Sequence, residues 1–283
     1  TAEPAPMMLL DLARIERHDG DLAGATAHLK AALDASSDPA VRAEIVLVSS
    51  DLRVAKGDVE GAKKELADAL LALVPLRSVH DPAVRARALR AIARIDDRFG
   101  RTKQADEALQ GALEAAPRDK TQVGASLALM GSRALVRGDL AASREALRRA
   151  VGADLGEDDL VYFALWGRAV ERQHDAPSDG VADRVLASIR DDGTWASTLA
   201  AFALGRIKPA DLLAAAPSPS KQAEATFYVA LDRRSHGDRA GADAGFKQVA
   251  AGAGVDLLEA DLARQMLTPR VPLSPPPSVA AIP

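Results

Sequence analysis

Residues 81–117, DPAVRARALRAIARIDDRFGRTKQADEALQGALEAAP, carry the pattern that determines the predicted fold. Asp81 followed by Pro82 is typical of an N-cap and the first position of a helix. Apolar residues then recur at helical spacing up to Gly100, and a second stretch with the same spacing follows it. The segment therefore predicts two helices that fold back on each other at a glycine turn.

The same pattern recurs along the chain. The hexapeptide DPAVRA stands at 38–43 as well as at 81–86. A small residue stands five positions after each turn glycine, and a large apolar residue stands nine positions after it. The turn glycines are Gly20, Gly57, Gly100, Gly138 and Gly237; the small residues are Ala25, Ala62, Ala105, Ser143 and Ala242; the large ones are Leu29, Leu66, Leu109, Leu147 and Phe246. Such self-similarity predicts an array of stacked helical hairpins.

The pattern divides the chain into five parts, with six to seven helical pairs in all. They are an extension (1–6), four hairpins (7–156), two irregular hairpins (157–217), a terminal hairpin with a capping helix that begins near Val255 (218–267), and a proline-rich tail (268–283). The six prolines of the tail predict that it is not helical but extended or disordered. If the tail is ordered, either the body of the protein or a neighbour must hold it.

Composition excludes several classes of protein. The 283 residues carry a net charge of −4, which gives no basic footprint for nucleic acid, and no apolar run is long enough for a membrane span. The chain has no cysteine and no asparagine. Its excess of alanine and arginine is typical of a GC-rich bacterial genome. The start TAEPAP fits removal of a signal peptide, which favours the periplasm or cell envelope over the cytoplasm, but it also fits an arbitrary boundary.

The search for chemistry yields no catalytic, phosphate-binding or dinucleotide-binding motif, so we expect no enzyme, no metal and no cofactor. The histidines include no i, i+4 pair, and His18, His174 and His236 are interpreted as caps at helix ends. Trp166, Trp195, Phe227 and Tyr228 are interpreted as core residues, with a ligand pocket between the irregular hairpins as the alternative.

At this point the pattern resembles the tetratricopeptide repeat of bacterial proteins. The residues that carry the resemblance are Leu127, Met130, Gly131, Gly138, Asp139, Leu147 and Ala150 in the fourth hairpin, and Leu89, Ile92, Ala93, Gly100, Ala105, Leu109, Ala112 and Pro117 in the third. The aromatic residue usual near the start of the first helix is replaced by Leu or Val in the early hairpins, and the tyrosine before the turn is missing throughout. The resemblance implies an all-α, right-handed solenoid of helical hairpins with a C-terminal capping helix, in which the first helix of each pair lines a groove. Because the chain lacks asparagine, the usual clamp for a C-terminal carboxylate is excluded.

The arginines on the first helices suggest a binding surface. Arg87, Arg90, Arg94 and Arg98 fall on one face of the third hairpin's first helix, and comparable positions are taken by Arg14, Arg17, Arg168, Arg172, Arg233 and Arg234. Guanidinium groups bind carboxylates well, so this face could receive an acidic partner segment in the concave groove. The alternative is a solvated face that keeps the protein soluble.

These observations predict a non-enzymatic scaffold or adaptor that binds other proteins, as a subunit of a larger bacterial assembly. One alternative is a fixed structural subunit of an envelope complex, with the proline-rich tail packed on a neighbour. The other is a regulatory or sensor domain of a longer signalling protein.

Overall fold

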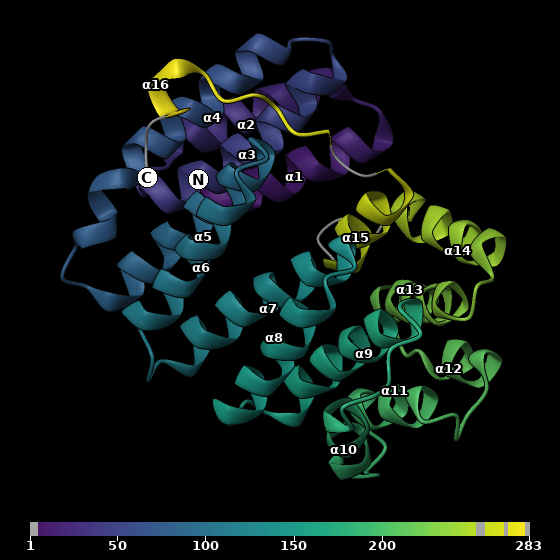
Figure 1. Ribbon diagram of the computed structural model, residues 1–283. Helices are drawn as coiled ribbons and strands as arrows, with labels where there is room; N and C mark the ends of the chain where they lie inside the picture. Colours follow the sequence, from purple (N-terminus) through teal and green to yellow (C-terminus); the bar gives the residue numbers. More distant parts are fainter. Residues whose placement is uncertain (1–4, 253–257, 269–270, 281–283) are drawn as a thin grey trace. The chain divides into compact units, whose positions relative to one another are not determined.

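The protein is all-helical, as the sequence predicts. The computed structural model describes residues 5–252, 258–268 and 271–280, and within these ranges it contains helices and no strand. The chain forms two compact units, one made of residues 1–126 and 270–283 and the other of residues 127–269. The border between them falls within α7 (Figure 1).

The helices of the first unit occupy the N-terminal part of the chain and a short stretch of the tail. They are α1 (Pro6–Asp19), α2 (Leu22–Ala35), α3 (Pro39–Ala55), α4 (Val59–Leu73), the 3-10 helix η1 (Val74–Ser78), α5 (Pro82–Arg98), α6 (Thr102–Ala115), the start of α7 (Lys120–Arg137), and α16 (Pro277–Ala280). The second unit holds the rest of α7, α8 (Leu140–Gly152), α9 (Glu157–Gln173), α10 (Val181–Ser188), α11 (Trp195–Ala203), α12 (Pro209–Ala215), α13 (Pro219–Ser235), α14 (Arg239–Ala251) and α15 (Leu258–Leu267).

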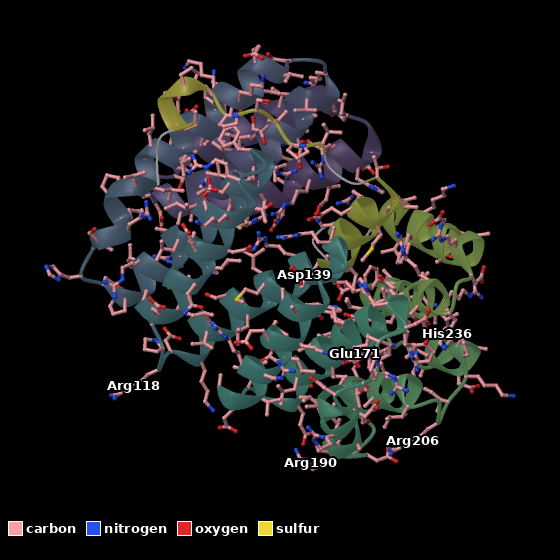
Figure 2. The ribbon with its side chains drawn as sticks, in the orientation of Figure 1. Arg118, Asp139, Glu171, Arg190, Arg206 and His236 are labelled. Atoms are coloured by element: carbon pink, nitrogen blue, oxygen red, sulfur yellow. The ribbon has the colours of Figure 1, made fainter. Side chains whose placement is uncertain are left out.

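Aspartates begin the helices where the sequence predicts them. The carboxylate of Asp38 accepts a hydrogen bond from the N–H of Ala40 at 2.8 Å, and that of Asp81 accepts one from Ala83 at 2.9 Å. In both helices the next residue is proline, whose missing N–H costs nothing at the first helical position. Asp139, labelled in Figure 2, caps α8 by accepting a hydrogen bond from the N–H of Ala142.

The turn glycines adopt the left-handed conformation that the pattern requires. Gly20, Gly57, Gly100, Gly138 and Gly237 have φ between 64° and 85°, a region that residues with a Cβ enter only at a cost. The small and large residues that follow each glycine by five and nine positions are all buried. The predicted hairpin turns and their packing positions are therefore confirmed.

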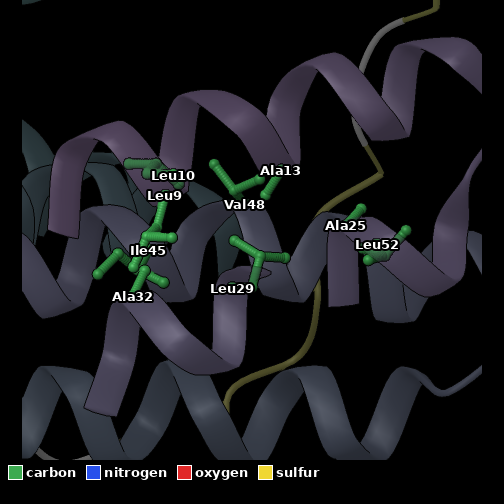
Figure 3. Packing of buried hydrophobic residues seen from close by; sticks show 9 residues of the cluster. All are labelled: Leu9, Leu10, Ala13, Ala25, Leu29, Ala32, Ile45, Val48 and Leu52. Carbon is green, nitrogen blue, oxygen red and sulfur yellow. The ribbon is translucent and has the colours of Figure 1, made fainter. Parts of the chain in front are cut away.

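Packing between successive hairpins is visible in the first unit. Ala25 and Leu29 of the first hairpin share one buried cluster with Ile45 and Leu52 of α3 (Figure 3). The helix α3 contacts both α1 and α2, and α5 contacts both α3 and α4. The first helix of each of these hairpins thus packs on the hairpin before it, while the right-handed solenoid and the division into repeats remain predictions.

The end of the second unit contains the helix that the sequence predicts as a cap. The helix α15 packs on α13 and α14, and Leu262 and Met266 on it are buried. Residues 255–257, with which the predicted helix begins, lie outside the described residues.

The proline-rich tail differs from its prediction. Residues 271–276 have no regular structure, but Pro277–Ala280 form the short helix α16 beside α4 (Figure 1). The prediction that the tail contains no helix was wrong, because a proline at the first helical position supplies a suitable φ and needs no hydrogen-bond donor. The N–H of Leu273 donates to the carbonyl of Arg98 at 2.7 Å, Arg101 donates to the carbonyl of Val279, and the Val279 side chain is fully buried. The described tail is thus held by the protein's own first unit.

Candidate functional site

Three of the four arginines predicted on α5 contact carboxylates of the preceding first helix. Arg98 lies 2.8 Å from Asp51, Arg87 lies 3.5 Å from Asp38, and Arg94 pairs with Glu44. We call these six residues the arginine ladder. All but Arg98 keep between about a quarter and a half of their side-chain surface exposed. The ladder therefore joins α3 to α5 and still faces solvent.

Arg90 makes contacts of another kind, with the first turns of α7. Its guanidinium donates to Gln122 Oε1 at 2.8 Å and to Ser126 Oγ at 3.3 Å, both within the first unit. These partners carry no charge. Burial, together with the nearby charge of Arg87, lowers the pKa of the Arg90 guanidinium below its usual value. Arg90 thus acts as a hydrogen-bond donor to a neighbouring helix.

On α1, Arg17 extends the ladder by one helix. Its guanidinium lies 3.9 Å from Asp51, so this carboxylate is shared between α1 and α5. Arg14 lies 3.0 Å from Asp11 on its own helix. The structure therefore brings Arg17 and Arg98 together around one carboxylate.

Two of the four predicted arginines of the second unit form ion pairs within it. Arg168 lies 2.9 Å from Asp183 of α10, and Arg172 lies 2.9 Å from Asp232 of α13. Burial is the main reason that the pKa of Arg168 falls below its usual value, with the charge of Arg172 next. Arg234 donates to the carbonyl of Met266 on α15 at 3.1 Å, so these three arginines of the second unit have polar partners within it.

The sequence reasoning did not identify the acidic half of the ladder. Glu44 and Asp51 are seven residues apart on α3, which places them on one face of a helix, and Arg87, Arg94 and Arg98, at spacings of seven and four, share one face of α5. Opposite charges that each follow one helical face, on the first helices of successive hairpins, were the available signal. Exposed ion pairs contribute only about 0–1 kcal/mol each, so a carboxylate from outside could replace one at little cost.

A polar network in the second unit was also missed. The carboxylate of Glu224 accepts three hydrogen bonds at 2.7 Å each, from the Tyr162 hydroxyl, the Trp195 indole and the Lys221 ammonium. Glu224 is buried, while its three donors are partly exposed. The donors come from α9, α11 and α13. Helices that are far apart in sequence thus converge on one carboxylate.

A second buried glutamate lies next to this network. The hydroxyl of Tyr228 donates to Glu259 Oε1 at 3.2 Å, which ties α13 to α15. Burial raises the pKa of the Glu259 carboxyl above its usual value, and the charge of Glu224 adds to this. Burial also raises the pKa of Tyr162, and its hydrogen bond to Glu224 contributes further.

All the tyrosines and tryptophans of the chain lie in this unit. Of the predicted core aromatics, Trp166, Phe227 and Tyr228 are buried, and Trp195 is only partly so.

Two of the three histidines interpreted as caps, His174 and His236, make ring hydrogen bonds to carbonyls at helix ends. At the end of α13, labelled in Figure 2, the His236 ring bonds to the carbonyl of Asp232 in its own last turn at 2.8 Å. The His174 ring instead bonds to the carbonyl of Gly138, a residue of the preceding turn, at 2.6 Å.

Within the described residues, no group of three or more metal-ligating side chains is assembled. No helix in the same part of the chain is long and apolar enough to cross a membrane.

The sequence was compared with protein-family models and with curated proteins. No protein-family model matches the chain, and no curated protein does. The likeness to the tetratricopeptide repeat therefore rests on the quoted residues and on the hairpins that they form.

Proposed function

We propose that this protein is a non-enzymatic scaffold that binds other proteins through the face formed by α1, α3 and α5. The observation that carries the proposal is the arginine ladder. Arginines and carboxylates alternate across the first helices of successive hairpins, held at defined positions but partly exposed. An array of this kind offers fixed guanidinium groups to the carboxylates of an acidic partner segment.

The energetics of the ladder favour exchange with a partner. Each pair is partly exposed, so its own contribution to stability is small. For example, a partner carboxylate can replace Glu44 at Arg94. The free energy lost with the Glu44 pair is small, and the Glu44 side chain is released into water. Because the guanidinium groups are already oriented by the protein, less side-chain entropy is lost on binding.

The function is tested by affinity purification of the full chain from the cells in which it is native, followed by mass spectrometry. We expect partners in stoichiometric amounts. Recovery of the protein alone at low salt would contradict the scaffold function.

The face is tested with a charge-swapped variant, Arg94→Glu combined with Glu44→Arg. The swap keeps an ion pair between α3 and α5, so helix content by circular dichroism should not change, but it reverses the charges that a partner meets. The matched control is Lys64→Glu with Asp68→Lys, which swaps an exposed pair 3.1 Å apart on α4. We expect the ladder swap to lower partner recovery and the α4 swap to leave it unchanged. Equal recovery with both variants would exclude this face.

A further inference from the structure

The helix α1 presents an apolar stripe to solvent. Met8, Leu12 and Ile15 are 60%, 42% and 41% exposed, and their spacing of four and three residues places them on one face of the helix. We call these three residues the α1 outer stripe. The core-facing residues Leu10 and Ala13 are fully buried on another face. The stripe is thus a second apolar surface on a helix that already has a packed one.

The repeat shows what kind of element covers this position elsewhere. When the hairpins are aligned on their turn glycines, Met8 corresponds to Ile45 in α3 and Ile15 corresponds to Leu52. Both of these residues are buried in the cluster that α1 and α2 form (Figure 3). In α5 the residue that corresponds to Ile15 is Ile95, which is fully buried. Met8 and Ile15 therefore occupy positions at which later hairpins are covered by other helices, while the counterpart of Leu12 in α3 is the partly buried Ser49.

The flanks of the stripe are acidic. On the helical wheel Asp11 lies on one side, Glu16 lies on the other, and Asp19 continues the stripe by one turn. Arg14 pairs with Asp11, and His28 lies 2.7 Å from Glu16. A second copy of this chain packed on the stripe would bring these carboxylates close to their own equivalents, which is unfavourable. A partner with basic flanks would meet opposite charges.

Building on the scaffold function proposed above, we propose that the α1 outer stripe binds an amphipathic helix of another protein, with an apolar stripe flanked by Lys and Arg. The partner helix covers Met8, Leu12 and Ile15 as the first hairpin covers Ile45 and Leu52. This site is separate from the arginine ladder, and it selects a partner of the opposite charge.

The experiment measures the binding of two labelled helical peptides to the full chain by fluorescence anisotropy. Both peptides carry the same leucine stripe, flanked by lysine in one and by glutamate in the other. We expect the lysine peptide to bind at least about tenfold more tightly. Leu12→Glu and Ile15→Glu should each weaken it about tenfold or more, because a charge then faces the apolar stripe of the peptide. The control is Leu71→Glu, which changes a 44% exposed leucine on α4 and should have no effect.

Several results would overturn this inference. They are no binding of either peptide, equal binding of both, equal effects of Leu12→Glu and Leu71→Glu, or a concentration-dependent dimer of the protein that Leu12→Glu abolishes. The two proposals can fail separately. If native partners are recovered equally with wild-type protein and Leu12→Glu while the peptides do not bind, only the role of the stripe is lost. If no partners are recovered at all, the scaffold function falls.

Discussion

Replacing Glu224 with alanine tests whether the buried network holds the second unit together. Glu224 accepts hydrogen bonds from Tyr162, Trp195 and Lys221 at 2.7 Å each. A hydrogen bond from a neutral donor to a charged acceptor is worth about 1.5 kcal/mol at the low end of its range. The tyrosine and tryptophan bonds therefore amount to about 3 kcal/mol. The Lys221 ammonium is partly exposed and regains water, so it adds little.

We expect Glu224→Ala to lower the free energy of unfolding by about 3 kcal/mol, which corresponds to a Tm lower by roughly 10 °C. Glu224→Gln keeps the shape and one acceptor oxygen, so its loss should be about 1 kcal/mol. The assay is urea unfolding followed by tryptophan fluorescence. Both tryptophans of the chain lie in the second unit, so the signal reports that unit.

The control is Glu60→Ala on α4, where the side chain is 84% exposed and the change should stay within about 0.5 kcal/mol. A loss below about 1 kcal/mol for Glu224→Ala would refute the reasoning. It would mean that the three donors find water as readily as they find the carboxylate.

Three further predictions follow from burial and backbone geometry. Burial raises the pKa of the Glu259 carboxyl above its usual 4.5. The free energy of unfolding should therefore fall as pH rises from that value through the pKa of the folded state. Thermal melts from pH 4 to 8 should show this slope, and Glu259→Gln should flatten it. Gly57→Ala should lower the free energy of unfolding by about 1–2 kcal/mol, because of its positive φ alone. Gly100→Ala should lower it further, because the new Cβ would come 2.8 Å from Pro272 of the tail. Thermal unfolding measures both losses. Val279→Asp would place a carboxylate in a fully buried position, so it should detach the tail and raise amide exchange across residues 271–280, and unchanged exchange would contradict this packing.

Local chemistry explains why so much of the fold was predictable. Asp81 caps a helix through atoms two residues away, and Gly100 turns the chain through its own φ, so neither depends on distant parts of the protein. The small and large residues after each turn face a helix that is close in sequence. Prediction failed at α16, where proline content was taken to exclude a helix although Pro277 suits the first position of one.

The candidate site was less predictable, because its contacts join distant helices. The sequence places the arginines of α5 on one face, but it does not say that Asp51 would serve both Arg17 and Arg98. The network around Glu224 joins residues from 162 to 224, and no spacing within one helix indicates it. Such contacts depend on how the hairpins pack against one another, and residue spacing within a single sequence does not specify that packing.

The return of the tail to the first unit affects the order in which the protein can fold. Arg98 and Leu273 are joined by a backbone hydrogen bond although 174 residues separate them, and closing so long a loop costs entropy. During synthesis the helices α1–α6 emerge early and can pair locally. The place that Val279 fills stays open until the whole second unit has been made. During that interval the surface that Val279 covers is exposed on an otherwise folded first unit. A chaperone or an incorrect partner could bind it then.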